Sequence, residues 1–370
     1  MTNPVRVALV LNRMDSGGIE AVVMNYCRYM TSGQVQVDLY ACRDSSFPQK
    51  EELEKLNIPV RLIPPYTHVG EYQQVLTKAF REEGYDVVHA HLNTMSVFPL
   101  FAAWRAGVPV RICHNHATAH WGEGKKTLLK YILRPFNKWF ATHYFACSNQ
   151  AGEWMFGRRD MEAGRVKILP NAILEETYQY QPREREALRQ KLGITPETWV
   201  LGNVGRFTYT KNHDFLLHLT ALLKKRGHQV ALLLVGEGEL EEKIRQEAET
   251  LELENQVIFA GVQKNVAPYY WAMDLFCLPS FYEGFGLAAL EARAAGLPCI
   301  CSEQVSPEVL DETNGCQLKV EGEKALKDWA DQAEKYLALP RAPGKPLPPR
   351  LSIRPAAAEL ARWYQEVRKG

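Results

Sequence analysis

Glu283 and Glu291 are two carboxylates eight positions apart in the stretch "FYEGFGLAALEA", residues 281–292. In one continuous helix they would lie about 12 Å apart along the axis, rotated by about 80°, and would share neither a proton nor a metal ion. Gly284 and Gly286 indicate instead a loop followed by a helix that begins near Gly286. The free amide groups and the dipole of such a helix start favour a diphosphate. The two glutamates then reach different parts of an elongated ligand, where carboxylates accept hydrogen bonds from the paired hydroxyls of a ribose or a hexose.

A second candidate site lies in "GNVGRFTYTKNHD", residues 202–214, which follows a strand-like run and precedes a helical one. Gly205 lets the backbone approach a ligand closely, while Arg206 and Lys211 offer two fixed positive charges. Loops that join a strand to a helix start are places where phosphates bind. Taken alone, this segment is equally compatible with a solvated surface loop. Each glutamate, taken singly, is better explained as an ordinary acid at or near a helix.

Three histidines in "HNHATAH", residues 114–120, raise the question of a metal site. His114 and His116 follow a strand-like run with no carboxylate nearby, so we expect no metal ion here. The letters H-N-H alone do not define an HNH nuclease motif. A structural histidine bonded to the backbone is the alternative to a functional role for each of them.

Two further patterns exclude common cofactors. The glycines of "LLLVGEGELEEK", residues 232–243, lack the third glycine of a dinucleotide site and are followed by acids, so a tight turn is expected and NAD is not. The eight cysteines are scattered and form no CxxC pair, which argues against a zinc site and against a disulfide framework.

Short apolar runs alternate with amphipathic stretches from "VRVALVLN" (5–12) to "VKILPN" (166–171). This rhythm is typical of a parallel sheet covered by helices on both faces. After a charged segment at 183–192 the rhythm restarts with "WVLGNVGR" (199–206) and continues to "PCICS" (298–302). We therefore predict an α/β fold of two doubly wound, Rossmann-like domains, with the carboxyl ends of both sheets facing a central cleft.

The composition fits a two-domain globular protein of the cytoplasm. The chain has 370 residues, of which 46% are hydrophobic and 24% are charged, and its formal net charge is +1. This balance argues against a nucleic-acid partner. The N-terminus has no signal-peptide pattern, and no apolar run approaches the roughly 18 residues of a membrane span.

The candidate residues fall into two spaced pairs, Arg206 and Lys211 as R-x₄-K and Glu283 and Glu291 as E-x₇-E. Further stretches occur in order along nearly the whole chain: "DSGGIEAVV", "DVVHAH", "CSN", "LPNAI" and "VGEGELEEK". This ordered set resembles the family-four retaining glycosyltransferases of the GT-B fold, the group 1 transferases of exopolysaccharide and capsule type.

The resemblance implies that Arg206 and Lys211 stabilise the charge that develops on a leaving nucleoside diphosphate, as a metal ion does elsewhere. The chain contains no Asp-x-Asp pair, which metal-dependent transferases of the other major fold use, so no metal and no cofactor are expected. Glu283 is implied to contact the donor sugar and Glu291 the ribose hydroxyls. A histidine near the reacting sugar is also implied; we take it to be His116, with His114 as the alternative.

Other positions are implied to approach the donor closely. Gly17 and Gly18 would let the loop after the first strand reach the donor phosphate and the acceptor. Val262 lies where the base of the nucleotide is usually held. Backbone contacts to the donor are implied at Gly205, Phe285, Gly286 and Leu287.

The resemblance assigns acceptor binding to residues 1–175 and donor binding to residues 176–345, with a C-terminal helix at 355–370 that packs back on the N-terminal domain. The implied reaction moves a sugar from a nucleotide donor, expected to be a uridine diphosphate (UDP) sugar, to a glycan or a lipid-linked glycan. Retention of the anomeric configuration and a role in cell-surface polysaccharide synthesis are implied with it.

Residues 125–143, "KKTLLKYILRPFNKWFATH", combine five basic side chains with apolar and aromatic ones. A basic amphipathic segment suits the anionic inner face of a membrane, where a lipid-linked acceptor is found. The alternative is a helix packed on its own sheet with a solvated basic face. The basic residues are Lys125, Lys126, Lys130, Arg134 and Lys138.

Two rival functions share this architecture. A sugar-nucleotide epimerase or hydrolase would need further acid–base carboxylates, and a non-catalytic donor-binding subunit would bind nucleotide sugars without transferring them. The intact set of four charged residues argues against a degenerate site. One departure from the family concerns "SEQVSPEV" (302–309), which lacks the usual glycine before Pro307–Glu308, so we infer no donor selectivity from this loop.

Overall fold

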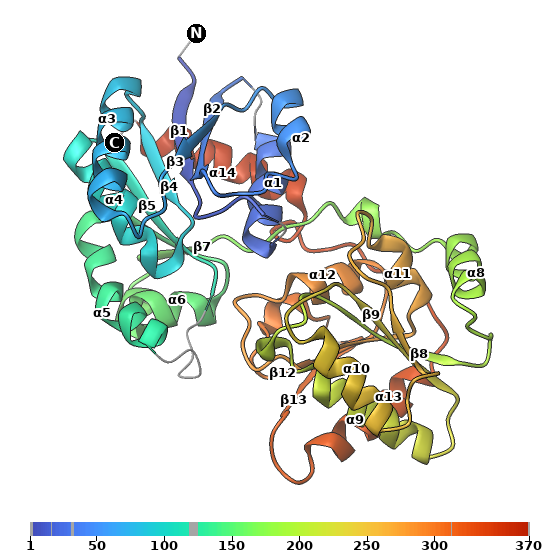
Figure 1. Ribbon diagram of the computed structural model, residues 1–370. Coiled ribbons are helices and arrows are strands. Elements are labelled where there is room, and N and C mark those ends of the chain that lie inside the picture. Colours follow the sequence, from blue (N-terminus) through green and yellow to red (C-terminus); the bar gives the residue numbers. More distant parts are fainter. Residues whose placement is uncertain (1–2, 16, 31–32, 118–124, 312, 369–370) are drawn as a thin grey trace. The chain divides into compact units, whose positions relative to one another are not determined.

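The computed structural model describes residues 3–15, 17–30, 33–117, 125–311 and 313–368. The chain divides into two compact units, one made of residues 1–174 and 348–370 and the other of residues 175–347 (Figure 1). Each unit is a parallel sheet with flanking helices, so the predicted pair of doubly wound, Rossmann-like sheets is confirmed.

The first unit is built on a seven-stranded sheet in the order β3-β2-β1-β4-β5-β6-β7. The strand order reverses between β1 and β4, which makes this the switch point of a doubly wound sheet. Apolar side chains dominate its strands because both faces of such a sheet are covered by helices. The strands are β1 (Val5–Val10), β2 (Val35–Cys42), β3 (Val60–Ile63), β4 (Val87–Ala90), β5 (Val110–Asn115), β6 (His143–Ala146) and β7 (Val166–Ile168).

Helices of the first unit include one from the far end of the chain. Helix α14 (Ile353–Val367) contacts α1 (Gly18–Met30), and Figure 1 draws it in red among blue and green elements. The other helices are α2 (Lys50–Lys55), α3 (Val69–Glu83), η1 (Asn93–Ser96), α4 (Val97–Ala106), α5 (Lys125–Phe140), α6 (Asn149–Phe156) and α7 (Arg158–Glu162).

The second unit has a six-stranded parallel sheet in the order β10-β9-β8-β11-β12-β13. Its strands are β8 (Trp199–Val204), β9 (Val230–Val235), β10 (Val257–Phe259), β11 (Leu275–Leu278), β12 (Cys299–Ser302) and β13 (Gly315–Leu318). Its helices are η3 (Glu175–Tyr178), α8 (Pro182–Lys191), η4 (Tyr209–Lys211), α9 (His213–Lys225), α10 (Glu241–Thr250), α11 (Ala267–Ala272), α12 (Leu287–Ala294), η5 (Pro307–Val309) and α13 (Ala325–Leu337).

Two elements of the second unit were not predicted as helices. The charged segment at 183–192 forms most of α8, where the buried Arg189 binds Asp274. Helix α13 places the fully buried Trp329 in the core of the unit, and the Trp329 indole N–H donates to Lys319 O at 2.9 Å. Among the described residues, no helix is both long enough and apolar enough to cross a bilayer.

Candidate active site

The loop after β8 carries Arg206 and is fixed by a glycine turn from the next strand. The Phe207 N–H donates to Glu237 O at 2.9 Å, and a Cβ on Gly236 would lie only 2.1 Å from Gly205 O. Gly236 also has a φ of +137°, which side chains rarely adopt. The glycines of the G-x-G pattern therefore let two backbones pack directly against each other.

The two cations of the R-x₄-K pair have different surroundings. Arg206 is exposed, and its side chain makes no ion pair within the part of the chain that the structure describes. Lys211 is partly buried, and its Nζ donates to the Glu283 carboxylate. Ser280 Oγ donates to the same carboxylate oxygen at 3.1 Å. The structure thus brings Lys211 and Glu283, 72 residues apart, into one charged pair.

Backbone and side-chain bonds hold the loops of this charged pair together. The Phe281 N–H donates to Thr210 O at 2.8 Å, and Asn212 Nδ2 donates to Pro279 O at 3.1 Å. Tyr209 stacks on Phe281 with ring centroids 5.0 Å apart. Because β8 and β11 are parallel neighbours, the loops at their carboxyl ends meet at one edge of the sheet.

Helix α12 begins where the sequence predicts it, directly after Gly286. This residue is the N-cap with φ +99°, and a Cβ there would lie 2.6 Å from Val305 Cγ1. Only glycine fits both the backbone conformation and the space. The N–H groups of Leu287 and Ala288 precede the first intrahelical bond of α12, which the Ala289 N–H makes to Gly286 O. They offer donors for an anion close to the charged pair.

Glu291 lies one helical turn deeper and is held by two phenols. Tyr178 OH donates to Oε1 at 2.9 Å, and Tyr270 OH donates to Oε2 at 2.7 Å. Burial raises the pKa of Glu291, and these two hydrogen bonds oppose the rise. Each carboxylate oxygen has a second lone pair, so the group can still accept from ligand hydroxyls. Neither tyrosine carries a sequence signal that would have predicted this contact.

Four histidines at the carboxyl ends of the neighbouring strands β4 and β5 form a buried cluster in the first unit. His89 Nε2 lies 3.0 Å from His114 Nδ1, and His91 Nδ1 lies 2.9 Å from His116 Nε2. Burial lowers the pKa of all four, that of His116 to about 3. The rings are therefore neutral and hydrogen-bonded in pairs. We call His89, His91, His114 and His116 the histidine cluster.

The histidine cluster differs from the alternative of a structural histidine bonded to the backbone, because its rings bond to one another. Their partners are other imidazoles, in addition to Tyr364 OH, which lies 2.6 Å from His89 Nδ1. His89, His91 and His114 each place a ring nitrogen within 4.8 Å of the others, a spacing loose enough to admit a metal ion. Three of the six nitrogens of these rings are engaged in bonds between rings. The sequence prediction of a histidine beside the reacting sugar stays a prediction.

The remaining predicted positions lie in loops after strands. Gly18 opens α1, and a Cβ on Gly17 would lie 2.3 Å from a Glu20 carboxylate oxygen. Val262 is exposed beside Gly261, whose carbonyl accepts from the Gly236 N–H at 2.9 Å. In the second unit the predicted residues therefore share one edge of the sheet, while Gly17, Gly18 and the two predicted histidines belong to the first unit.

Helix α5 exposes apolar side chains. Trp139 is 71% exposed, and Leu128, Leu129 and Ile132 are also exposed. Arg134 Nη1 donates to Trp154 O at 2.7 Å, and Lys138 binds Asp160. These two cations are thus engaged by α6 and α7, and the exposed apolar side chains differ from the solvated basic face that was the alternative reading. The side chains of Lys125 and Lys126 lie outside the described residues.

Comparisons with known proteins point in one direction. The family model "Glycosyl transferases group 1" matches residues 184–345, and "Glycosyltransferase Family 4" matches residues 16–176. EpsF of Bacillus subtilis (strain 168), which carries the name of a glycosyltransferase, is 34% identical over 98% of this chain and 94% of its own length. The Escherichia coli UDP-Gal:alpha-D-GlcNAc-diphosphoundecaprenol alpha-1,3-galactosyltransferase is 26% identical over 61% of this chain and 60% of its own length.

Solved structures share the fold. The crystal structure of Anabaena Alr3699/HepE in complex with UDP-glucose superposes with a TM-score of 0.77, at 22% identity, over 98% of this chain and 97% of its own. WaaG, a glycosyltransferase involved in lipopolysaccharide biosynthesis, superposes with a TM-score of 0.68, at 21% identity, over 97% of this chain and 95% of its own.

Proposed function

This chain belongs to the group 1, family 4 glycosyltransferases of the GT-B fold and acts in polysaccharide synthesis, and from that premise we propose that it transfers a sugar from a UDP-sugar to a lipid-linked glycan with retention of configuration. The observation that carries the proposal is the meeting of Lys211 and Glu283 beside the start of α12. Two relatives support the choice of ligands, since HepE was crystallised with UDP-glucose and the Escherichia coli relative is named for UDP-Gal and a diphosphoundecaprenol-linked sugar.

The diphosphate of the donor is placed against the cations and the start of α12. Arg206 has no carboxylate partner among the described residues, so its guanidinium is available for a phosphate. The ammonium of Lys211 is held by Glu283 until a donor arrives. These fixed positive groups and the N–H groups of Leu287 and Ala288 stabilise the charge of the leaving UDP without a metal ion.

The sugar and the ribose are placed by the two carboxylates. Glu283 lies in the loop before α12 and accepts from hydroxyls of the donor sugar, while Glu291 inside the helix accepts from the ribose hydroxyls. Val262 and the neighbouring loop lie beside the base. Residues 176–345 thus bind the donor, whereas residues 1–175 bind the acceptor and contribute Gly17, Gly18 and His116.

The reaction breaks the bond between the anomeric carbon and the diphosphate oxygen and forms a bond from that carbon to the acceptor oxygen on the same face. The proton of the acceptor hydroxyl passes to the departing phosphate oxygen. A neutral His116 suits a hydrogen bond to the sugar, because an imidazolium would compete with the cations for the phosphate. No protein nucleophile is required by this scheme.

A thermal-shift and transfer experiment tests the central proposal. UDP-glucose and UDP-galactose should raise the unfolding temperature, with a stabilisation of about 2.7 kcal/mol when the ligand is at a hundredfold excess over its Kd. Arg206→Ala should abolish the shift, and Arg183→Ala, another exposed arginine of the same unit, should not. Absence of any shift with all nucleotide sugars would refute the proposal, and epimer or free sugar formed at full rate from donor alone would favour the rival activity.

The membrane surface is proposed as the place where the acceptor is met, through the exposed apolar side chains of α5. Trp139 and Ile132 are suited to insert at the level of the lipid headgroups. Vesicles containing phosphatidylglycerol should co-sediment the protein, and the double substitution Ile132→Ser and Trp139→Ser should release it. Leu62→Ser, an exposed apolar side chain on β3, is the matched control and should leave binding unchanged. Equal binding by both variants would exclude α5 as the contact.

A further inference from the structure

A cavity of about 590 Å³ lies in the second unit, at the edge of the sheet opposite the candidate active site. Its lining includes Trp199, the first residue of β8, and Asp274 and Pro298, which directly precede β11 and β12. Arg206 and Glu283 instead follow the carboxyl ends of β8 and β11. Because the strands are parallel, the cavity and the candidate site are separated by the strand length, about 20 Å for the six residues of β8.

One wall of the cavity is the segment 339–345, which contains Pro340 and Pro343. A Cβ on Gly344 would lie 2.2 Å from Ala294 O, and a Cβ on Gly296, whose φ is +74°, would lie 2.3 Å from Ala342 O. The segment therefore packs backbone to backbone against the end of α12. This contact fixes the wall, so the cavity is built by tight packing.

The charges of the cavity favour an anion. Four cations line it against two carboxylates, an excess of two positive charges; the cations are Arg185, Arg293, Arg341 and Lys345, and the carboxylates are Asp274 and Asp311.

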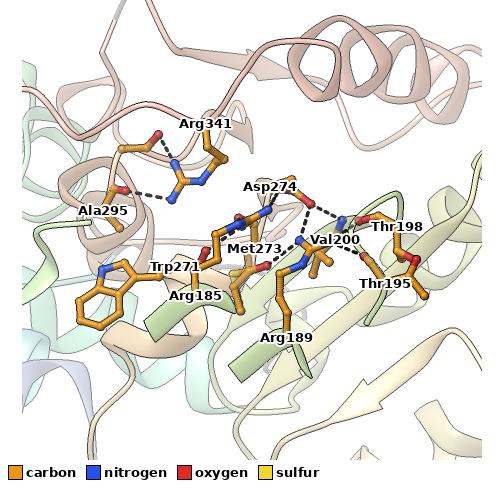
Figure 2. Close-up of polar contacts among 12 residues, drawn as sticks. Arg185, Arg189, Thr195, Thr198, Val200, Trp271, Met273, Asp274, Ala295 and Arg341 are labelled. Carbon is orange, nitrogen blue, oxygen red and sulfur yellow. Dashed lines mark hydrogen bonds and ion pairs between the residues drawn. The ribbon is translucent and has the colours of Figure 1, made fainter. Parts of the chain in front are cut away.

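Both carboxylates are already satisfied by the protein. Asp274 binds Arg185 and Arg189 and accepts from the Val200 N–H at 2.8 Å, as Figure 2 shows. Asp311 accepts from the N–H and the hydroxyl of Thr313, at 2.9 and 2.7 Å, and its carboxylate lies 3.7 Å from Lys345 Nζ. Neither acid therefore leaves an uncompensated negative charge that would repel an anion.

Arg341 is held by neutral groups, an aromatic ring and backbone carbonyls. Its guanidinium lies 4.6 Å from the ring centre of Tyr180. Figure 2 shows Nη2 donating to Ala295 O at 3.0 Å, and Nη1 donates to Gly296 O. Its buried Nε has no hydrogen-bond partner, and it makes no ion pair, among the residues that the structure describes. Burial and the nearby Arg185 lower the pKa of Arg341 to about 10. Arg341 is partly buried, and a partly buried guanidinium without an ion-pair partner gains from a bound anion.

We propose that this cavity binds a small organic phosphate, with the phosphate held by Arg341 and Lys345 and the organic part against Trp199 and the neighbouring prolines. The excess of two positive charges matches a phosphate monoester, and a guanidinium fits phosphate oxygens in a bidentate manner. The volume exceeds the needs of a bare phosphate and falls in the range of about 300–1,000 Å³ that is typical of small-molecule sites. This inference does not depend on the proposed donor.

The test is calorimetric titration of the full-length chain carrying Arg206→Ala, which disables the proposed donor site. Glucose 1-phosphate and uridine monophosphate are the probes, glucose and uridine are their uncharged matches, and inorganic phosphate is the minimal anion. We expect at least one ester to bind while the uncharged matches do not; the preferred ester then identifies the organic part. No ester binding at millimolar concentration would overturn the proposal, as would inorganic phosphate binding as tightly as the better ester.

Two variants locate the binding. Lys345→Gln should weaken it by about tenfold, whereas the matched control Lys243→Gln should not, because Lys243 is 64% exposed, close to the 63% of Lys345, and binds Asp214 outside the cavity. Arg341→Gln should abolish binding; since Arg341 also holds the end of α12, Arg341→Lys tests whether a retained charge restores part of it. Ester binding that survives both Lys345→Gln and Arg341→Gln would show that the ligand lies elsewhere.

Discussion

Both units place polar side chains at the carboxyl ends of parallel strands, but one set is neutral and the other is charged. The histidine cluster of the first unit is buried, and its rings bond to one another. In the second unit Arg206 is exposed, and Lys211 and Glu283 form an ion pair at the edge of the sheet. The same position in the fold therefore carries two kinds of chemistry, depending on how much water reaches it.

Desolvation explains the difference. A buried imidazole loses the hydration of its charged form, so its pKa falls and it remains neutral. The charged groups of the candidate active site in the second unit have either solvent or a counter-charge beside them. We infer that the second unit supplies the electrostatic stabilisation of a leaving diphosphate, whereas the histidine cluster supplies hydrogen bonds without charge.

Lowering the pH to mildly acidic values tests the neutral histidine cluster. The resulting loss of stability should be the largest effect among these predictions. The pKa of each cluster histidine is lowered below 6.5, so below that pH the unfolded chain binds more protons than the folded chain, and stability falls as the pH falls. Between about pH 6.5 and about pH 5.5 we expect a loss of about 1 kcal/mol for each of the four imidazoles.

Urea unfolding followed by tryptophan fluorescence at several pH values measures this loss. His213, the buried histidine of the second unit, whose pKa burial lowers to about 4, adds to it with the same sign. Stability that is flat between pH 7 and about pH 5.5 would mean that the cluster is protonated in the folded protein, and the contrast between the units would then be wrong.

Arg206→Ala tests the charged residues at the sheet edge of the second unit. Removing a fixed positive group from the site of a leaving diphosphate should lower kcat by about 100- to 1,000-fold. The free energy of unfolding should hardly change, because the exposed Arg206 makes no ion pair with described residues. Transfer assays and urea unfolding of this variant and of Arg183→Ala separate the two effects. Equal kcat for the two variants would contradict the assignment.

His114→Leu should sharpen the comparison through a single imidazole. The substitution keeps the volume roughly constant but leaves His89 Nε2 without its partner at 3.0 Å, which should cost about 1–3 kcal/mol of stability at pH 7. The loss of stability in acid should also become smaller by the contribution of one imidazole. His68→Leu is the control, because His68 is exposed and should change stability by less than about 0.5 kcal/mol. Equal losses for the two variants would show that the bonds between rings contribute nothing.

The local sequence pattern was sufficient to predict the fold and part of the candidate active site. The alternation of apolar runs and helices predicted both sheets, and the spacing of glycines predicted the start of α12 at Gly286, because these depend on neighbours along the chain. The contact of Tyr178 with Glu291 joins residues 113 positions apart, and nothing in either local segment encodes it. The pairing of His89 with His114 likewise depends on strand register, which the sequence alone does not fix.

Solvent exposure was harder to predict than structure. The cations of the amphipathic segment at 125–143 were expected to meet an anionic membrane or, alternatively, to face water, whereas Arg134 and Lys138 bind α6 and α7. The reason is that long cationic side chains reach backbone carbonyls and acids of neighbouring helices, and composition does not show this. The cavity beside Arg341 was not predicted either, because its walls come from segments far apart in the sequence.

Glu291→Gln should have a small effect on stability, and it tests a carboxylate whose burial lies between that of the neutral histidine cluster and that of the exposed Arg206. Burial already raises the pKa of Glu291, so a neutral amide removes a desolvation cost while its oxygen still accepts from one phenol. The hydroxyl of the other tyrosine can rotate to accept from the amide N–H, and the free energy of unfolding should change by less than about 1 kcal/mol.

Binding of UDP-glucose should weaken by about tenfold if the carboxylate holds the ribose. Calorimetry and urea unfolding, with the exposed Glu254→Gln as control, measure both quantities. Unchanged UDP-glucose affinity would leave Glu291 as a structural partner of Tyr178 and Tyr270, and the donor would then be held by the charged loops alone.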